Sequence, residues 1–497
     1  MAQINIQNLT FGYDGASENV FENASFSFDT NWKIGLIGRN GRGKTTLLNL
    51  LLGNMEYSGN ISRNVHFDYF PYEVRDKKKT AIDILPEIYP EYDLWEVMKK
   101  LHDLELDEEC LYQPFETLSN GQQTKLLLAV LFTKENKFLL IDEPTNHLDF
   151  QSRECVKRFL NKEKGFIVVS HDRDFIDACV DHIISINKNN IEIQKGNFSS
   201  WWENRKNQDN FEINQNQKLK KDIARLEESV AQTQRWSDKV EKTKNGTRIA
   251  GLRPDKGAIG HKAAKMAQRS KAIEFRQNKA IEAKSKLLKN IEKQDDLFLN
   301  SEHLKDNVLI EVKNLSIFYG EKKIFEGLNF SVENGDRVAI CGQNGSGKTS
   351  LLKFILGEDI KYSGSIYKSG RLKISYISQK YDWLCGTLVD FAKENNIDQT
   401  RFLTMLIKLG FSRNLFDANL QDFSEGQKKK VLIAKSLCEE ANLYVWDEPL
   451  NYIDVISRIQ IEELLKDANI TLIFVEHDNA FVRNIATKRV QINNSIN

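Results

Sequence analysis

The chain has 497 residues, of which 40% are hydrophobic and 28% are charged, and its 70 basic residues balance its 70 acidic ones. This composition is typical of a soluble globular protein with two or three domains. No apolar run reaches the roughly 18 residues that cross a bilayer, and the N-terminus lacks the pattern of a signal peptide. We therefore expect a cytoplasmic protein and exclude an integral membrane protein.

The first predicted elements are apolar β-strands at residues 4–6 and 34–37, and the second leads directly into a glycine-rich loop. This loop precedes a predicted helix and reads Gly38-Arg39-Asn40-Gly41-Arg42-Gly43-Lys44-Thr45. It matches the pattern G-x-x-x-x-G-K-T, in which backbone N–H groups and a helix N-terminus bind phosphate oxygens. We predict that Lys44 reaches the β- and γ-phosphates of a nucleotide and that Thr45 binds magnesium.

Two later apolar strands are predicted to end next to polar side chains. Residues 138–142 end in Asp142 and are followed by Glu143, and residues 166–169 are followed closely by His171. We predict that Asp142 binds magnesium, that Glu143 polarises the attacking water and that His171 contacts the γ-phosphate. The less favoured alternative for Asp142 and Glu143 is a pair of surface acids at a strand end. A lone histidine at the position of His171 would more often be structural.

The middle of the chain, residues 205–300, is expected to form a separate helical linker. Apolar residues recur at spacings of four and three before a glycine-rich stretch and at spacings of seven, three and four after it, which indicates an antiparallel helical hairpin. Its tip, near residues 242–261, is strongly basic, whereas ordinary solvated helices mix charges of both signs. The basic residues of the tip and of the segment that follows it are Lys242, Lys244, Arg248, Arg253, Lys256, Lys262, Lys265 and Arg269.

The order of elements in the first part recurs about 305 residues later, which indicates a duplicated domain. The second copy contains Gly342-Gln343-Asn344-Gly345-Ser346-Gly347-Lys348-Thr349, followed by the acids Asp447 and Glu448 and by His477. Buried apolar strands alternating with helices predict an α/β fold with a mainly parallel sheet and ligands at its carboxyl edge. We predict a first domain over residues 1–204, the linker over 205–300 and a second domain over 301–497.

Each copy also has a short polar motif between its glycine loop and its acid pair. Ser119 and Gly121 lie in the first, and Ser424 and Gly426 lie in the second. Each serine is placed to cap a helix, and a capped helix is the plainest interpretation of either motif alone.

The ordered set of glycine loop, serine motif, acid pair and histidine resembles the ATP-binding cassette (ABC) ATPases in both halves of the chain. Two cassettes on one chain with a charged helical linker and no membrane domain resemble the ABC-F group of ribosome-acting ATPases. The sequence Gly196-Asn197-Phe198 is also similar to that group. Residues 29–33, the first glycine loop and residues 255–260 are similar to the Lsa-type antibiotic-resistance proteins.

This resemblance implies two ATP molecules and magnesium, with the cassettes packed head to tail. The ATP at Lys44 would then be shared with Ser424 and Gly426, and the ATP at Lys348 with Ser119 and Gly121. Tyr13 and Tyr319 match the aromatic residue that stacks on adenine, although either could simply be a strand residue. The full set of implied nucleotide contacts is Tyr13, Gly38, Arg39, Asn40, Gly41, Arg42, Gly43, Lys44, Thr45, Thr46, Ser119, Gly121, Tyr319, Gly342, Gln343, Asn344, Gly345, Ser346, Gly347, Lys348, Thr349, Ser350, Ser424 and Gly426.

The two copies differ from each other at the position of the family's conserved loop glutamine. The second copy has Gln379, which together with Thr349 and Asp447 is implied to hold magnesium, whereas the first has Tyr72. A phenol cannot replace an amide in orienting water, so we expect the two sites to hydrolyse ATP differently. Phe423 replaces the leading leucine of the second serine motif, a packing change that we expect to be tolerated.

The function implied by the resemblance is ATP-dependent binding to the 70S ribosome. The linker would enter the tRNA exit site, where the eight basic residues from Lys242 to Arg269 are predicted to bind RNA by neutralising phosphates of 23S rRNA. It would contact P-site tRNA as a further candidate partner, and it would displace lincosamides, pleuromutilins and streptogramin A. The protein is expected to be a monomer in solution without a membrane subunit. Two alternatives stay open, namely a housekeeping ABC-F translation factor acting on stalled ribosomes and the ATPase subunit of a drug exporter.

Overall fold

The computed structural model describes residues 3–243 and 307–492, with gaps at 15–18, 136, 147, 149, 188–189, 344, 382 and 469. Between these ranges it describes only residues 265, 268, 273, 275, 276 and 279. The structure separates into two units, the first formed by Met1–Ser199 with Asp295–Asn497 and the second by Ser200–Gln294. No helix among the described residues is both long and apolar enough to span a membrane.

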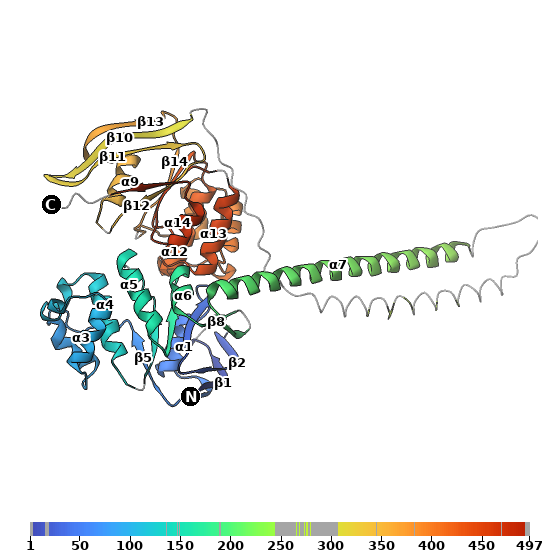
Figure 1. Ribbon diagram of the computed structural model, residues 1–497. Helices are drawn as coiled ribbons and strands as arrows, with labels where there is room; N and C mark the ends of the chain where they lie inside the picture. The colour runs from blue at the N-terminus through green and yellow to red at the C-terminus, as the bar shows by residue number, and fades with distance from the viewer. Residues whose placement is uncertain are drawn as a thin grey trace, which may run out of the picture. The chain divides into compact units, whose positions relative to one another are not determined.

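The first half of the chain, coloured from blue to green in Figure 1, contains a six-stranded sheet. Its strand order is β5-β6-β7-β3-β8-β9. All neighbouring strands are parallel except β8 and β9. A second, antiparallel sheet has the order β2-β1-β4. The strands are β1 (Gln3–Phe11), β2 (Phe21–Asp29), β3 (Lys33–Gly38), β4 (Ser58–Ser62), β5 (His66–Phe70), β6 (Lys137–Asp142), β7 (Phe166–Val169), β8 (His182–Ile186) and β9 (Ile191–Lys195).

The core of this half joins the two sheets to the helix after the first glycine loop. Ile4 and Phe28 come from the small sheet, Leu36 and Ile167 from the large sheet and Leu47 from the helix, and all are fully buried. The helices are α1 (Lys44–Leu52), α2 (Ala81–Ile88), α3 (Leu94–Asp103), α4 (Asn120–Phe132), α5 (Phe150–Lys162) and α6 (Arg173–Cys179), with 3-10 turns η1 (Glu108–Tyr112) and η2 (Phe115–Thr117).

The second half repeats this plan with a five-stranded parallel sheet of order β14-β15-β16-β12-β17 and an antiparallel sheet of order β11-β10-β13. The strands are β10 (Val308–Tyr319), β11 (Lys322–Glu333), β12 (Arg337–Cys341), β13 (Lys361–Lys368), β14 (Ile374–Ile377), β15 (Leu443–Asp447), β16 (Leu472–Val475) and β17 (Lys488–Gln491). The helices are α9 (Lys348–Leu356), α10 (Leu388–Glu394), α11 (Gln399–Lys408), α12 (Glu425–Cys438), α13 (Val455–Asp467) and α14 (Asn479–Ile485), with 3-10 turns η3 (Arg413–Leu415) and η4 (Leu420–Asp422). The α/β fold predicted for both copies is confirmed.

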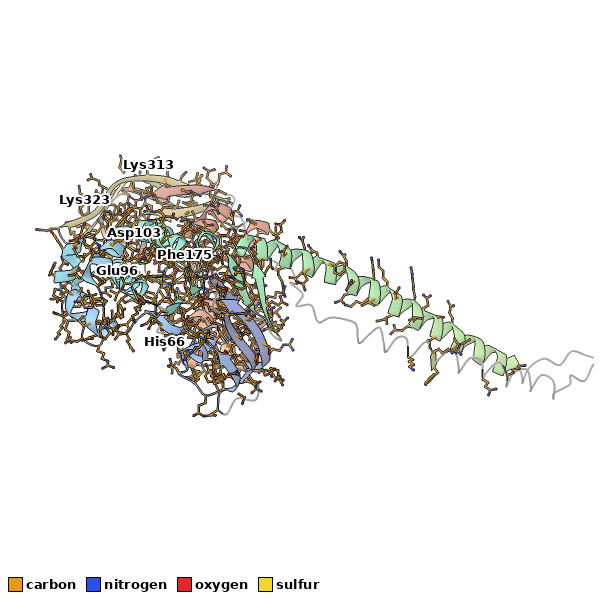
Figure 2. All side chains as sticks on the ribbon, turned by 60° about the horizontal axis from the view of Figure 1, so that its bottom comes forward. His66, Glu96, Asp103, Phe175, Lys313 and Lys323 are labelled. Atoms are coloured by element: carbon orange, nitrogen blue, oxygen red, sulfur yellow. The ribbon has the colours of Figure 1, made fainter. Side chains whose placement is uncertain are left out.

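The linker unit contains one long helix, α7 (Phe198–Thr243), with many exposed side chains along its described part (Figure 2). Of the residues predicted to bind RNA, Lys242 lies in α7 without a described side chain, and Lys265 is helical and exposed. The other six, Lys244, Arg248, Arg253, Lys256, Lys262 and Arg269, lie outside the described residues. The linker hairpin and the domain boundaries stay predictions.

Candidate functional site

Both glycine loops connect the carboxyl end of a central strand, β3 or β12, to the N-terminus of a helix, α1 or α9. The last glycine of each loop has a left-handed backbone, with φ of 87° at Gly43 and 94° at Gly347. A Cβ atom at Gly43 would lie only 2.5 Å from the Val20 side chain, so both the turn and the packing require glycine. The loop therefore presents the free N–H groups of the helix N-terminus at the edge of the sheet.

The loop lysines fold back over their own loops. Lys44 Nζ donates hydrogen bonds to the carbonyl oxygens of Gly38 at 2.8 Å and Arg39 at 3.4 Å. Lys348 Nζ does the same with Gly342 and Gln343, both at 2.9 Å. Each ammonium group thus lies over the concave side of the loop, where phosphate oxygens can replace the carbonyls as its partners.

The predicted magnesium ligands are neighbours in the first half. Thr45 Oγ1 donates to Asp142 Oδ2 at 3.2 Å, and the Tyr69 hydroxyl donates to the same oxygen at 3.1 Å. In the second half the side chain of Asp447 is fully buried at the end of β15, and burial raises its pKa to about 6. Hydroxyl and carboxylate oxygens are the ligands that Mg²⁺ prefers, so the residues at both positions suit a magnesium ion bound with nucleotide phosphates.

The two predicted catalytic glutamates share an unusual backbone. Glu143 has a φ of 50° and Glu448 a φ of 49°, in the left-handed region that non-glycine residues rarely adopt. Their backbone N–H groups donate to the carbonyls of Val169 and Val475, at the ends of neighbouring strands. Such strain persists only where the surroundings fix it, and here it fixes the direction in which each carboxylate leaves the sheet.

The surroundings of the two carboxylates differ. Burial, with the neighbouring Asp142 charge, raises the pKa of Glu143 to about 8, and its Oε1 is 3.1 Å from His171 Nε2. Burial, together with the charge of Lys44, lowers the pKa of His171 well below its usual value. This pair is therefore uncharged near neutral pH.

The surroundings of the second glutamate, Glu448, have the opposite net effect on its pKa. Glu448 Oε2 accepts hydrogen bonds from Gln379 Nε2 at 2.9 Å and from Asn451 Nδ2 at 2.7 Å, and His477 Nε2 lies 3.4 Å from Oε1. Burial alone would raise its pKa, but the hydrogen bonds and charge of His477 and the bond from Gln379 lower the pKa of Glu448 to about 2. Glu448 is therefore a charged carboxylate at neutral pH.

Tyr72 occupies the position of Gln379. Phe70 pairs with Ile141 and Ile377 pairs with Trp446, so both loops leave their sheets at the same register. The Tyr72 hydroxyl donates to the carbonyl oxygen of Glu87 at 3.2 Å, on α2 and away from Glu143. Tyr72 and Gln379 therefore differ in side-chain chemistry, as the sequence shows, and also in direction, because only the Gln379 side chain points to its catalytic glutamate.

A pocket of about 650 Å³ lies over the first glycine loop, in the size range of small-molecule sites. It gathers the loop, the acid pair and the histidine that the sequence predicted to act together. It is lined by Asn40, Gly41, Gly43, Lys44, Thr45, Thr46, Tyr69, Phe70, Pro71, Thr124, Asp142, Glu143, Asn146, Val169 and His171.

The first loop also contacts the second half of the chain. Asn40 Nδ2 donates to the Tyr452 carbonyl at 2.7 Å, and Asn40 N donates to Asp454 Oδ2 at 3.3 Å. Gly426 lies against Asn40, because a Cβ atom there would be 2.5 Å from Asn40 Nδ2. Gly426 of the second serine motif thus contacts Asn40 of the first loop, and their sharing of one ATP stays a prediction.

The remaining predicted contacts are placed as follows. Ser119 and Ser424 each cap a helix with a reciprocal bond to the glutamine three residues later. Gly121 lies near Leu148 and Ser152 of its own half, and its pairing with the second loop stays a prediction. Tyr13 and Tyr319 are each 49% exposed, and the Tyr13 hydroxyl is 2.8 Å from Thr46 Oγ1. Asn344 lies outside the described residues, and the others, Arg42, Gly345, Ser346, Thr349 and Ser350, lie in the loops or in the first turn of α9.

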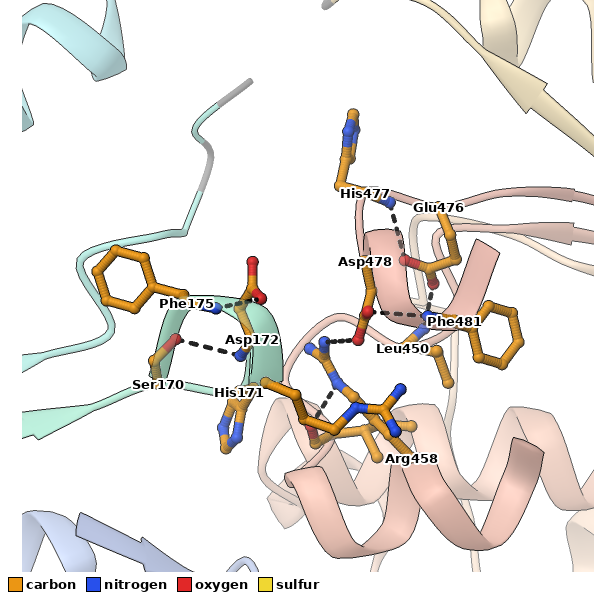
Figure 3. Close-up of polar contacts among 12 residues, drawn as sticks. Ser170, His171, Asp172, Phe175, Leu450, Arg458, Glu476, His477, Asp478 and Phe481 are labelled. Atoms are coloured by element: carbon orange, nitrogen blue, oxygen red, sulfur yellow. Dashed lines mark hydrogen bonds and ion pairs between the residues drawn. The ribbon is translucent and has the colours of Figure 1, made fainter. Parts of the chain in front are cut away.

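Sequence reasoning missed two arginines that connect the two halves. Arg153 donates to the His477 carbonyl at 3.2 Å, and Arg173 forms a bidentate ion pair with Glu462. It also missed Arg458, which donates to Asp478 Oδ2 at 3.0 Å within the second half, where Asp478 caps α14 by accepting from Phe481 N (Figure 3). Arg153 and Arg458 occupy equivalent places in the two copies, so their recurrence was the signal that could have found them.

The opposite protonation of the two glutamates predicts a pH difference between the sites. In a Glu448→Gln variant, hydrolysis depends on Glu143, which must lose its proton to act as a base. The rate should rise about tenfold between pH 7 and pH 9, because the Glu143 pKa of about 8 lies between them. In a Glu143→Gln variant the rate should change less than about twofold over this range. Steady-state phosphate release measures both, and equal pH profiles would contradict the assignment.

The chain is similar to known ATP-binding proteins in both of its halves. The family described as ABC transporter matches residues 21–146 and 325–451. The chain is 29% identical over 488 residues to the ribosome protection protein VmlR of Bacillus subtilis (strain 168), covering 97% of this chain and 86% of VmlR. It is 26% identical over 517 residues to the ATP-binding protein Uup of Buchnera aphidicola subsp. Acyrthosiphon pisum (strain APS), covering 98% and 80%.

Solved structures support the fold. The chain is similar to the archaeal ribosome recycling factor aABCE1, crystallised with a ribosomal stalk protein, with a TM-score of 0.63, 18% identity and coverage of 97% of this chain and 87% of that one. It is similar to RNase-L Inhibitor with a TM-score of 0.62, 18% identity and coverage of 98% and 87%. At this identity the likeness concerns the fold of the paired α/β domains.

Proposed function

Since the chain belongs to the ABC family and is an ATPase, we propose that it is an ABC-F protein that binds two ATP molecules with magnesium and acts on the ribosome. The contact of Asn40 with Gly426 and Tyr452 carries the first part of this proposal. A γ-phosphate between the first loop and the second serine motif joins the two halves, and its hydrolysis releases them.

The proposed chemistry follows from the positions of the side chains. Lys44 and Lys348 neutralise the β- and γ-phosphates, and a bound Mg²⁺ supplies charge stabilisation to the same oxygens. Magnesium in the first site would be held by Thr45 and Asp142. Thr349, Asp447 and Gln379 would hold it in the second. Glu143 and Glu448 accept the proton of the attacking water, and His171 and His477 lie beside them to contact the γ-phosphate.

The ribosome is the proposed partner because of two observations. The chain aligns over 97% of its length with VmlR, whose name describes ribosome protection. The predicted linker tip carries basic residues suited to 23S rRNA phosphates. We propose that the linker enters the tRNA exit site, near P-site tRNA where present, and displaces lincosamides, pleuromutilins and streptogramin A, as in the Lsa group. The protein then acts in the cytoplasm as a monomer.

The proposal predicts that hydrolysis controls release from the ribosome. A Glu143→Gln, Glu448→Gln double variant should bind ATP, close and remain bound to 70S ribosomes, because the isosteric amides cannot accept a proton. Sedimentation through a sucrose cushion should recover the variant with ribosomes in ATP and release it in ADP. Equal recovery in ATP and ADP, or none in either, would contradict the cycle.

Growth of an expressing strain tests the drug specificity. Expression of the wild-type chain should raise the inhibitory concentrations of lincomycin and tiamulin. Expression of a Lys44→Ala, Lys348→Ala variant should leave both inhibitory concentrations unchanged. If the ribosome is bound but drug tolerance is unchanged, the protein is a housekeeping factor for stalled ribosomes. If the protein pellets with membranes and drug efflux rises, it is an exporter ATPase.

A further inference from the structure

The side chain of Lys429, on α12, is charged yet only 1% exposed. Its Nζ donates to the carbonyl oxygens of Ser378 at 3.2 Å and Gln379 at 3.3 Å, and it lies 5.3 Å from the ring centre of Tyr381. All three partners belong to the loop that follows β14. Burying an ammonium group costs several kcal/mol unless it is well paired, so an apolar residue would fill this position at lower cost.

The loop that Lys429 holds carries a side chain of the proposed catalytic centre. Gln379 Nε2 donates to Glu448 Oε2 at 2.9 Å, and Lys429 bonds the backbone carbonyl of the same glutamine. The contacts therefore run from α12 through Lys429 and Gln379 to Glu448. A side-chain hydrogen bond is lost when its atoms separate by about half an ångström, so the position of this loop decides whether the amide reaches the carboxylate.

The first half lacks this arrangement at the equivalent positions. Thr124, five residues after Ser119, corresponds to Lys429, five residues after Ser424, and it lines the nucleotide pocket. The loop residue Tyr72 bonds the Glu87 carbonyl instead of the catalytic carboxylate. The fold forms around threonine in one copy and lysine in the other, so a buried lysine here is not a requirement of the fold.

We propose that Lys429 is a positioning residue for ATP hydrolysis at the second site. By holding the carbonyls of Ser378 and Gln379 against α12, it keeps the Gln379 amide on Glu448, and it acts through Gln379 rather than on the nucleotide. The inference rests on the proposed roles of Gln379 and Glu448.

The test isolates the second site in a Glu143→Gln background. Lys429→Met, which keeps the length and removes the charge, should lower kcat about tenfold, a part of the roughly 10²- to 10⁴-fold that a general base contributes. KM for ATP should change less than about twofold, because the phosphate-binding loop is untouched. Lys429→Thr, which places the side chain of the first copy at this position, should give the same loss.

Two controls separate positioning from folding. Lys428→Met removes the neighbouring charge of α12, whose Nζ donates to the Gln421 carbonyl at 2.9 Å, and should leave kcat within about twofold. In a Glu448→Gln background, where only the first site hydrolyses, Lys429→Met should have no effect on kcat. Loss of activity in both backgrounds would mean a general structural role and would overturn the inference.

A double-mutant cycle completes the test. If Lys429 acts through Gln379, then Lys429→Met added to Gln379→Ala should cause no further loss, since residues that share one interaction are not additive. If the losses of kcat in Lys429→Met and Gln379→Ala multiply in the double variant, the role of Lys429 is overturned while the proposed function stands. An unchanged kcat in Lys429→Met would have the same meaning. If Glu448→Gln fails to abolish hydrolysis in the Glu143→Gln background, the proposed second site fails and the inference with it.

Discussion

Glu448→Gln should remove most of the ATPase activity at pH 7, whereas Glu143→Gln should leave at least about half of it. Glu448 is charged at neutral pH, because the hydrogen bond and charge of His477, with the hydrogen bond of Gln379, outweigh burial and lower its pKa to about 2. Glu143 is largely protonated, because burial raises its pKa to about 8. Only a deprotonated carboxylate accepts a proton from water, so the second site should provide the larger share of turnover.

Phosphate release by each single variant at saturating ATP measures this difference. Glu448→Gln should lower the total rate about tenfold. The second site loses nearly all of its activity, because a general base contributes roughly 10²- to 10⁴-fold, and the activity that is left comes from the first site. Glu394→Gln, on an exposed acid of α10 in the same half, is the control and should change the rate less than about twofold. Equal losses in Glu143→Gln and Glu448→Gln would show that the sites are equivalent.

Asp454→Ala should destabilise the second domain by about 3–5 kcal/mol, the usual cost of leaving one member of a buried ion pair alone. Asp454 is fully buried, and its Oδ2 is 3.0 Å from Lys430 Nζ, which is itself buried. Burial alone would raise the pKa of Asp454, but the Lys430 and Lys44 charges lower it. The same carboxylate accepts Ser457 N and Oγ at the start of α13, so a helix cap is lost as well.

Chemical denaturation checks this value, and two variants act as controls. Glu326→Ala breaks the exposed pair with Lys323 and should cost less than about 1 kcal/mol. Lys430→Met added to Asp454→Ala should restore part of the loss, because no unpaired charge then remains buried. A double variant less stable than Asp454→Ala would show that Lys430 is stabilised by other partners.

Most of the proposed nucleotide site could be predicted from the sequence, because its residues lie in short continuous motifs. The loop from Gly38 to Thr45 is continuous, and the acid and histidine positions follow from strands that end at one edge of a parallel sheet. Tyr72 could be set against Gln379 because both follow a short apolar strand at similar distances from their glycine loops.

The protonation states could not be predicted in this way. The pKa of Glu448 depends on Gln379, 69 positions away in the chain, and on the direction that its loop takes. Tyr72 and Gln379 differ visibly in sequence, but only packing shows that the phenol turns to α2. The contacts of Arg153 and Arg173 with the other half depend on how two distant segments meet, and periodicity carries no such information.

Helix α12 has a consequence for the energetics of the two sites. Gly426 faces the first glycine loop, and Lys429, three residues later, holds the loop of Gln379 at the second site. If binding at one site shifts this rigid segment, the free energy of coupling must be the same whichever site is filled first. In α4 the residue equivalent to Lys429 is Thr124, which faces its own nucleotide pocket. A coupling of this kind would run through α12, because α12 contacts the first glycine loop through Gly426 and the loop of Gln379 through Lys429.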